Sequence, residues 1–324
     1  MQNDKPLVSV VIPTYNYGRF MPDAIDSILN QDFPQGEIEI IVVDDGSIDG
    51  TGEIIEEKYR DRVKYIYQEN SGKAVAIRNG IEAAHGKYIF TLDADDIFLP
   101  GKIEKAVNIF ENDNSIVYVS HPVIYWYADK NMKKQEKLPA KICGKKICGK
   151  DLVKFYYKRN KFFGLGSTIS ARAEAIKRIP INGKDIGYTI DEYLAMFLME
   201  KGDAFFIEEL LSLYRVHSKS YSIKKLKERA RLDALARKFM LSLILASSFD
   251  EEIKALAILK AKIAELKLKE IKGIKSFFDI KDLWLHILSN RRLFGKDIFK
   301  IIKDYRILQR SMPVLAINLL RKSR

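Results

Sequence analysis

The chain has 324 residues, 47% hydrophobic and 30% charged, a composition typical of a globular protein with one large domain or a domain and an appendage. No stretch approaches the roughly 18 uninterrupted apolar residues of a membrane-spanning helix, and Pro13 and Asn16 interrupt the first apolar run, so we expect neither a membrane span nor an export signal. Two cysteines, Cys143 and Cys148, are too few for a disulfide framework or a zinc site, and we expect free thiols.

The basic residues are concentrated toward the C-terminus. The whole chain has a formal net charge of +12, whereas residues 218–324 hold 26 Lys and Arg against 11 Asp and Glu and so carry +15. Residues 1–217 therefore carry −3. A basic segment of this kind indicates attraction to an anionic surface, either nucleic acid or a membrane.

Short apolar runs and amphipathic segments alternate along residues 8–92. The runs are rich in β-branched residues and predict buried strands, and the segments between them predict helices. The expected strands are 8–12, 38–43, 63–67 and 88–92, and the expected helices are 19–30, 50–59 and 73–84. Such alternation is typical of a parallel sheet covered on both faces. We expect an α/β fold with a mostly parallel, Rossmann-like sheet flanked by helices.

The rest of the chain has two parts. Residues 115–215 are less regular and predict mixed α/β structure, with strands at 116–120, 167–170 and 204–207 and a helix at 191–201. After His217 the pattern is helical to the last residue. We therefore expect a first domain over residues 1–220 and a basic, all-helical extension over residues 221–324.

Polar clusters follow three of the predicted strands, at residues 13–16, 44–47 and 93–96. In open α/β sheets ligands bind beyond the carboxyl ends of the strands, so we expect these clusters to form one site. Asp93 and Asp95 stand at i and i+2 of an extended segment and point to the same side, as two ligands of one hard cation would. A solvated acidic turn is the alternative.

Five segments together resemble a known family. They are PLVSVVIPTYN, EIIVVDDGSIDGT, NSGKAVAIRNGIEAAHGKYIFTLDADD, TIDEYLAMFLMEKG and YRVHSKSYS. In this order and spacing they resemble the family 2 glycosyltransferases, inverting enzymes with an A-type nucleotide-sugar-binding fold. The resemblance implies transfer of a sugar from a nucleotide-diphosphate donor, by family frequency a UDP-sugar, to a hydroxyl acceptor in glycolipid or cell-surface polysaccharide synthesis.

The resemblance assigns donor binding to seven side chains, which are Thr14, Tyr15, Asp45, Lys73, Arg78, Asp93 and Arg215. It implies that Thr14 and Tyr15 approach the nucleoside. It also implies that Asp45 hydrogen-bonds the base and that Asp93 contacts the ribose. Structural alternatives are open for several of these: packing for Tyr15, capping of a turn for Asp45, and pairing with a nearby acid for Arg78.

The resemblance also implies a cation and a general base. Asp95 matches the acid that binds Mn²⁺ or Mg²⁺, and His217 is a second expected ligand, with a structural hydrogen bond as its alternative. Asp191 matches the acid that takes the proton from the acceptor hydroxyl, and Glu192 replaces it if the helix begins one residue later. Ile190 departs from the family, in which a glutamate is common here. The alternative for Asp191 is an acid favoured by the helix dipole.

Two further segments carry expectations. Residues 162–167 match a loop that contacts sugar or acceptor in the family, although its glycines could equally serve a tight turn. Residues 296–310 and 314–320 are apolar at helical spacing among Lys and Arg, a pattern that suits contact with an anionic membrane, packing on the first domain or pairing of two subunits. We expect a cytoplasmic enzyme that can sit at the inner face of the cell membrane to reach a lipid-linked acceptor. No recognised motif supports nucleic acid as a partner.

Two other function classes compete with this prediction. The same fold could serve a catalytically inactive protein that binds sugar nucleotides or assists assembly. Nucleotidyl transfer shares the pattern of an acid after a strand, but it normally begins with a Gly-rich basic loop that VVIPTYNYGRF lacks.

Overall fold

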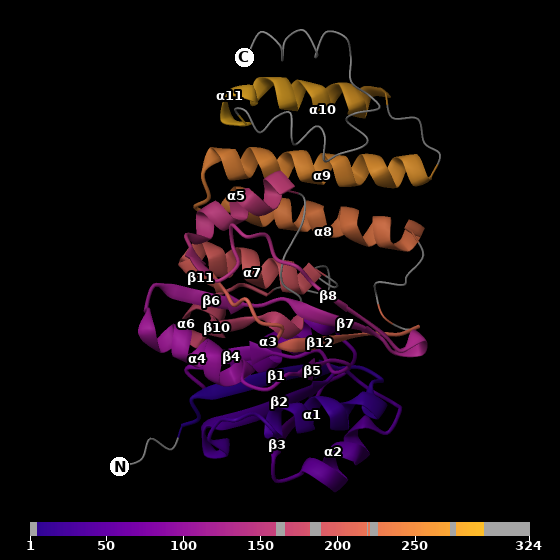
Figure 1. The fold of residues 1–324 in the computed structure, drawn as a ribbon. Coiled ribbons are helices and arrows are strands. Elements are labelled where there is room, and N and C mark those ends of the chain that lie inside the picture. Colours follow the sequence, from indigo (N-terminus) through magenta and orange to yellow (C-terminus); the bar gives the residue numbers. More distant parts are fainter. Residues whose placement is uncertain are drawn as a thin grey trace. The chain divides into compact units, whose positions relative to one another are not determined.

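The computed structural model describes residues 5–159, 166–181, 189–218, 220, 226–272 and 277–294. The chain divides into two compact units, one formed by residues 1–149 and 163–223 and the other by residues 150–162 and 224–324 (Figure 1). The second unit thus includes a segment from the middle of the sequence. Residues 296–324, on which the two amphipathic segments were predicted, lie outside the described residues.

The first unit is a mixed α/β structure. Its strands are β1 (Val8–Thr14), β2 (Ile38–Asp44), β3 (Val63–Tyr67), β4 (Tyr88–Thr91), β5 (Ile97–Phe98), β6 (Ile116–Ser120), β7 (Val123–Tyr127), β8 (Met132–Gln135), β9 (Lys145–Ile147), β10 (Ser170–Arg172), β11 (Asp203–Phe206) and β12 (Ser212–Val216). Its helices are α1 (Met21–Leu29), α2 (Thr51–Tyr59), α3 (Lys73–Ala83), α4 (Lys102–Asn112), α6 (Ala173–Ile176) and α7 (Ile190–Lys201).

The strands form two sheets. The larger has the order β3-β2-β1-β4-β10-β6-β11-β9, and the smaller has the order β5-β12-β7-β8. The first four strands of the larger sheet are parallel, as predicted. β10 runs antiparallel to β4 and β6 because the chain enters it from the carboxyl end of β4, where the 3₁₀ turn Gly166–Thr168 (η4) precedes it. The strand predicted at 167–170 is thus a turn followed by a later strand.

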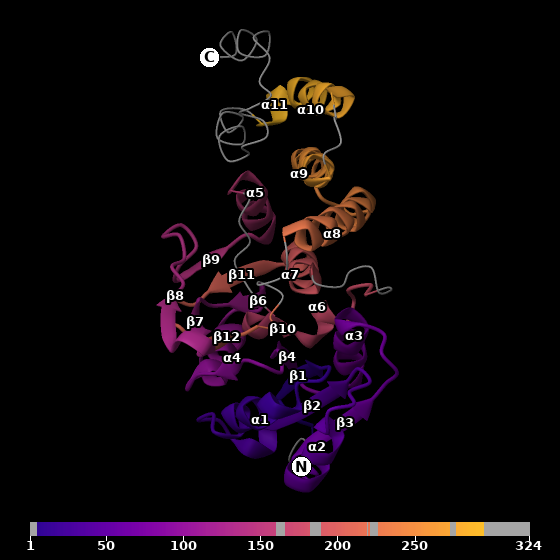
Figure 2. The same cartoon turned by 90° about the vertical axis from the view of Figure 1, so that its right-hand side faces the viewer.

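Helices cover both faces of the parallel strands (Figure 2). One face packs against α1, α2 and α4, and its strand residues are Val8, Val10, Ile12, Ile40, Val42, Tyr88 and Phe90. On the other face α3 lies on β1 and β2, and a Cβ atom at Gly80 would lie only 2.3 Å from Val11 Cγ1. Because neither face of β1 and β4 meets solvent, these strands read as continuous apolar runs, whereas β3 at the edge of the sheet keeps exposed side chains at Lys64, Tyr65 and Tyr67. The predicted α/β fold is confirmed.

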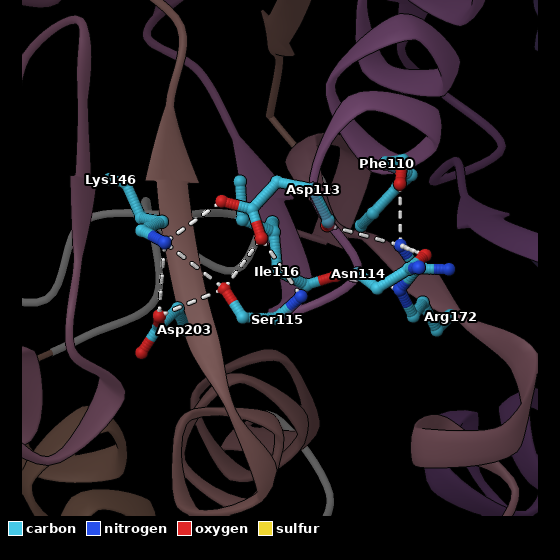
Figure 3. Close-up of polar contacts among 8 residues, drawn as sticks. All are labelled: Phe110, Asp113, Asn114, Ser115, Ile116, Lys146, Arg172 and Asp203. Atoms are coloured by element: carbon cyan, nitrogen blue, oxygen red, sulfur yellow. Dashed lines mark hydrogen bonds and ion pairs between the residues drawn. The ribbon is translucent and has the colours of Figure 1, made fainter.

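A buried arginine ties the antiparallel strand β10 to the end of α4 and the start of β6 (Figure 3). Arg172 donates hydrogen bonds to the backbone carbonyls of Ile116, at 2.8 Å from Nε, and of Phe110, in the last turn of α4. Carbonyls in the last turn of a helix have no partner within the helix, so the arginine supplies one for Phe110. On the other side of the same loop, Lys146 pairs with Asp113 at 2.8 Å and so connects β9 to the start of β6.

The second unit is helical over its described residues, as predicted for the C-terminal part. Its helices are α5 (Gly149–Arg159), α8 (Leu226–Ala246), α9 (Glu251–Ile271), α10 (Phe277–Ser289) and α11 (Arg291–Phe294). Lys154 of α5 pairs with Asp250, just before α9, and Lys158 of α5 pairs with Glu252 in the first turn of α9, each at 2.7 Å. No helix in the part of the chain that the structure describes is long and apolar enough to cross a membrane.

Candidate functional site

The polar clusters meet at one edge of the larger sheet. β2, β1 and β4 are adjacent and parallel, so the residues that follow them emerge side by side. Asp45 also donates its backbone N–H to the carbonyl of Thr14 at 2.8 Å, which joins the first two clusters directly. This edge therefore holds the polar residues that the sequence predicted to form one site.

Lys73 connects two acids that are 98 positions apart in the sequence. Its Nζ lies 2.7 Å from Asp93 Oδ1 and 3.3 Å from Asp191 Oδ1. Lys73 is the first residue of α3, Asp93 follows β4, and Asp191 lies in the first turn of α7. All three side chains are half-buried. The predicted general base and two of the expected donor-binding residues thus form one cluster.

Burial and charge set the ionisation of this cluster. Burial opposes the charge on Lys73, but the carboxylates of Asp191 and Asp93 outweigh it and raise the pKa of Lys73 well above its ordinary value. Burial raises the pKa of Asp93 to about 6, with Lys73 opposing and Asp191 adding to the rise. The ammonium group of Lys73 therefore lies between the carboxyl groups of Asp93 and Asp191.

The backbone of Gly166 lies against the carboxylates of Asp93 and Asp191. A Cβ atom at this position would lie 2.8 Å and 2.9 Å from the two carboxylate oxygens of Asp93 and 3.1 Å from Asp191 Oδ1. The absence of a side chain here allows the turn to approach both carboxylates. Residues 162–165 of the loop that the sequence predicted to contact sugar or acceptor lie outside the described residues.

The two expected metal ligands are also adjacent. His217 Nε2 lies 3.0 Å from Asp95 Oδ2, although the residues are 122 positions apart. The buried ring of His217 packs against Tyr17 and Phe20, with ring centroids 5.6 Å and 5.0 Å away. In the described ranges no group of three or more His, Cys, Asp or Glu side chains converges as a metal site.

Asp96, the third acid of the DADD sequence, is structural. It is fully buried, and its carboxylate accepts hydrogen bonds from Ser167 Oγ and, at 2.9 Å, from the backbone N–H of Arg215. Both oxygens thus already have partners within the fold. Asp96 joins the acidic segment to the turn and to β12.

Asp45 organises the loop between β3 and α3. Its carboxylate accepts hydrogen bonds from Gln68 Nε2 and the backbone N–H of Ser71, both at 2.7 Å, and from the N–H of Gly72 at 2.8 Å. Nearby, Thr14 is buried and Tyr15 is 46% exposed. Asp45 therefore fixes the segment that leads to Lys73, whatever else it binds.

Two expected donor contacts have other partners in this structure. The Arg215 guanidinium pairs with Asp23 at 2.6 Å and lies 4.7 Å from the ring centroids of both Phe20 and Trp126. Arg78 lies along α3 with its Nε 3.8 Å from Glu82. Neither arginine joins the cluster around Lys73, and their contacts with a donor stay predictions.

One residue that supports the site, Lys102, was not predicted from the sequence. Lys102, the first residue of α4, is fully buried and donates to the backbone carbonyl of Ser167. The apolar spacing of Ile103, Ala106 and Phe110 predicts an amphipathic helix, but a lysine at its start reads as solvated. Nothing in the local pattern distinguishes a buried lysine there from an exposed one.

Comparison with known sequences places the chain in a family. The family model described as glycosyl transferase family 2 matches residues 9–179. An uncharacterized glycosyltransferase of Rickettsia typhi is 32% identical over 245 residues, which are 72% of each chain. TuaG of Bacillus subtilis, named for teichuronic acid biosynthesis, is 44% identical over 108 residues, which are 32% of this chain and 42% of TuaG.

Solved structures share the fold. TarS of S. aureus (residues 1–349), crystallised with UDP-GlcNAc, matches with a TM-score of 0.63 and 18% identity over 94% of this chain and 90% of that chain. The mannosyltransferase PcManGT of Pyrobaculum calidifontis, in complex with GDP-Man and Mn²⁺, matches with a TM-score of 0.57 and 18% identity over 99% and 88%. These likenesses show the fold, and the family model together with the Rickettsia relative establishes that the chain belongs to glycosyltransferase family 2.

Proposed function

We propose that this glycosyltransferase is an inverting, metal-dependent hexosyltransferase that uses a UDP-sugar. Its acceptor is a hydroxyl group of a glycan or of a lipid-linked precursor in cell-surface polysaccharide or glycolipid synthesis. The observation that carries the proposal is the shared contact of Lys73, whose Nζ lies 2.7 Å from Asp93 and 3.3 Å from Asp191. This contact holds the candidate base beside the acid expected at the donor ribose.

Asp191 acts as the general base in this proposal. Its carboxylate takes the proton from the acceptor hydroxyl while the hydroxyl oxygen forms a bond to the anomeric carbon of the donor sugar. The bond from that carbon to the diphosphate oxygen breaks on the opposite face, and its electron pair leaves with the nucleoside diphosphate. One displacement on opposite faces inverts the anomeric centre. The Nζ of Lys73, 3.3 Å from Asp191 Oδ1, orients this carboxylate.

Asp95 and His217 fit a divalent cation that also binds the donor. Their side-chain atoms lie 3.0 Å apart and supply one oxygen and one nitrogen ligand, a set that suits Mn²⁺ and is acceptable to Mg²⁺. Two protein ligands leave positions for water and for diphosphate oxygens, as is usual for cations bound with phosphate substrates. Such a cation would stabilise the charge on the departing diphosphate.

Donor binding is assigned to the edge formed by β1, β2 and β4. We place the nucleoside near Thr14, Tyr15 and Asp45, the ribose at Asp93 and the diphosphate near Lys73. The UDP-GlcNAc in the TarS structure, which has the same fold, supports the choice of a UDP-sugar. The GDP-Man and Mn²⁺ in PcManGT support the use of a cation and make GDP-mannose the second donor to test.

The basic extension is assigned to membrane docking. Residues 1–220 form the catalytic domain in this proposal. Residues 221–324 bring this domain to the anionic inner face of the cell membrane, because they hold most of the +15 net charge counted for residues 218–324. Sedimentation with phosphatidylglycerol vesicles at moderate salt tests this part. Full-length protein that stays in the supernatant with these vesicles contradicts the docking.

Replacement of Asp191 tests the chemistry. Nucleotide sugars that raise the melting temperature with Mn²⁺ are selected first, and UDP release from the strongest is then measured. Asp191→Asn keeps the shape of the side chain and removes the base, so we expect release to fall about 10²- to 10⁴-fold while UDP affinity changes little. Glu192→Gln, one position along α7, tests the alternative base.

The outcomes separate the alternatives. A wild-type protein that binds UDP-sugars but releases no UDP favours the inactive binding protein. Asp191→Asn with near wild-type release contradicts Asp191 as the base, and loss in Glu192→Gln alone moves that role to Glu192.

A further inference from the structure

Lys102 is a fully buried lysine next to the turn that contacts the acids of the candidate active site. Lys102 is 0% exposed, and its Nζ donates to the backbone carbonyl of Ser167 at 2.5 Å and lies 3.3 Å from Ser212 Oγ. The same Nζ lies 3.4 Å from the centroid of the Phe98 ring, a cation–π contact. Burying an ammonium group is costly unless its donors find partners, so a lysine retained here indicates a specific task.

The turn that Lys102 holds is the one beside the acids. Ser167 Oγ accepts a hydrogen bond from the backbone N–H of Asp93 at 3.0 Å and donates to Asp96. Gly166, the preceding residue, has its backbone against the carboxylates of both Asp93 and Asp191. A displacement of this turn therefore shifts the hydrogen bond that fixes the backbone of Asp93. It also changes the distance between Gly166 and the carboxylate of Asp191.

Two buried ionisable side chains lie on either side of Ser167. Asp96 and Lys102 are both 0% exposed, and they contact the hydroxyl and the carbonyl of this one residue. Burial lowers the pKa of Lys102 well below its ordinary value, with Asp96 opposing the shift, and burial raises the pKa of Asp96 well above its ordinary value. The turn is thus fixed between two strong polar groups, one from the acidic segment and one from α4.

We propose that Lys102 is a positioning residue for the transfer reaction. Its Nζ holds the turn Gly166–Thr168 in place, and that turn fixes the positions of the Asp93 and Asp191 carboxylates. The inference rests on the proposed function. Lys102 touches neither acid and acts through the turn. Of the donor contacts proposed above, Asp93 is bonded to the turn through its backbone N–H, whereas Asp45 and Asp95 share no hydrogen bond with the turn among those described above. We therefore expect donor affinity to change less than turnover.

The test separates turnover from donor binding in two variants. Lys102→Met keeps the length of the side chain and removes the donors, whereas Lys105→Met, on the same helix, removes an exposed lysine that pairs with Glu209. UDP release from UDP-GlcNAc with Mn²⁺ gives kcat and KM, and UDP titration gives the fraction of folded, binding-competent protein. We expect Lys102→Met to lower kcat at least about tenfold with KM within threefold, because small misplacements of reacting groups slow turnover strongly. Lys105→Met should stay within twofold of wild type.

A milder variant covers the case in which Lys102→Met does not fold. Ser212→Ala removes one acceptor of Lys102 Nζ together with the hydrogen bond that Ser212 Oγ itself donates to the Ser167 carbonyl at 2.9 Å. The bond from Lys102 to Ser167 stays, so we expect a folded protein with kcat lowered about threefold and KM unchanged. Folded Lys102→Met with the kcat of Lys105→Met overturns the inference. If that variant fails to fold, Ser212→Ala with wild-type kcat overturns it. Wild-type protein that releases no UDP from any donor overturns the proposed function instead, and the role of Lys102 with it.

Discussion

Replacing Gly166 with alanine adds one methyl group between the two acids of the candidate site. The new Cβ would lie 2.8 Å from Asp93 Oδ1, whereas ordinary contact begins at 3.4 Å, so the carboxylate or the turn must move by about 0.6 Å. Neither group moves freely, because Asp93 pairs with Lys73 at 2.7 Å and Thr91 Oγ1 donates to the carbonyl of Gly166. We expect unfolding free energy to fall by about 1 kcal/mol, as is usual for overpacking by one methyl group. We expect turnover to fall about 10- to 100-fold, since misplacement by 1 Å can slow a reaction about 10²-fold.

UDP release by Gly166→Ala, measured beside urea unfolding, checks both magnitudes. Gly36→Ala is the control, because a Cβ atom there meets nothing within 4 Å. It should release UDP at the wild-type rate and unfold at equal or slightly higher urea, since alanine restricts the unfolded chain. Should Gly166→Ala and Gly36→Ala release UDP at rates within twofold of each other, the space beside Asp93 and Asp191 does not limit turnover and the reasoning fails.

Three further variants test the fold and the cation. Burial raises the pKa of Glu39, but hydrogen bonds, that from Ser9 first, outweigh it and hold the pKa below 4.5. Its ionised form therefore stabilises the fold above that pH, and Glu39→Gln should lose about 1.5 kcal/mol at pH 7 in urea titrations, with a gap to wild type that shrinks in acid. Gly80→Ala puts a Cβ 2.3 Å from Val11 Cγ1 and should lower unfolding free energy by about 1 to 3 kcal/mol; an unchanged urea midpoint contradicts the close packing of α3 on β1. Asp95→Asn should abolish the stimulation of UDP release by Mn²⁺, and a variant that Mn²⁺ still stimulates fully excludes Asp95 as a ligand.

The fold was predictable because its signals are local. The sequences of β1 and β2 are rich in β-branched residues; β1 ends at proline and threonine, and β2 ends at an aspartate. The helix α1 between them has a clear apolar face. A parallel sheet buried on both faces needs only this alternation to be recognised. The direction of β10 was not predictable, because it depends on the edge at which the chain returns to the sheet.

The candidate site was predictable in its residues and not in its contacts. Motifs identified Asp93, Asp95 and Asp191 as chemistry-bearing acids, but no spacing in the sequence indicates that Lys73 lies between two of them. Arg215 shows the limit most clearly. Its partner Asp23 lies 192 positions earlier, so the ion pair depends on the packing of α1 beside β12. Contacts over such separations follow from the completed fold.

The position of Lys73 links the two halves of the proposed reaction. Its ammonium group contacts Asp93, on the donor side, and Asp191, on the acceptor side. A diphosphate that binds near this group competes with both carboxylates for the same three donors. Each hydrogen bond that turns toward phosphate is lost to Asp93 or to Asp191. In the proposed reaction, donor binding would thereby release the Asp191 carboxylate from part of its contact with Lys73, so that the carboxylate can accept a hydrogen bond from the acceptor hydroxyl once the donor is in place.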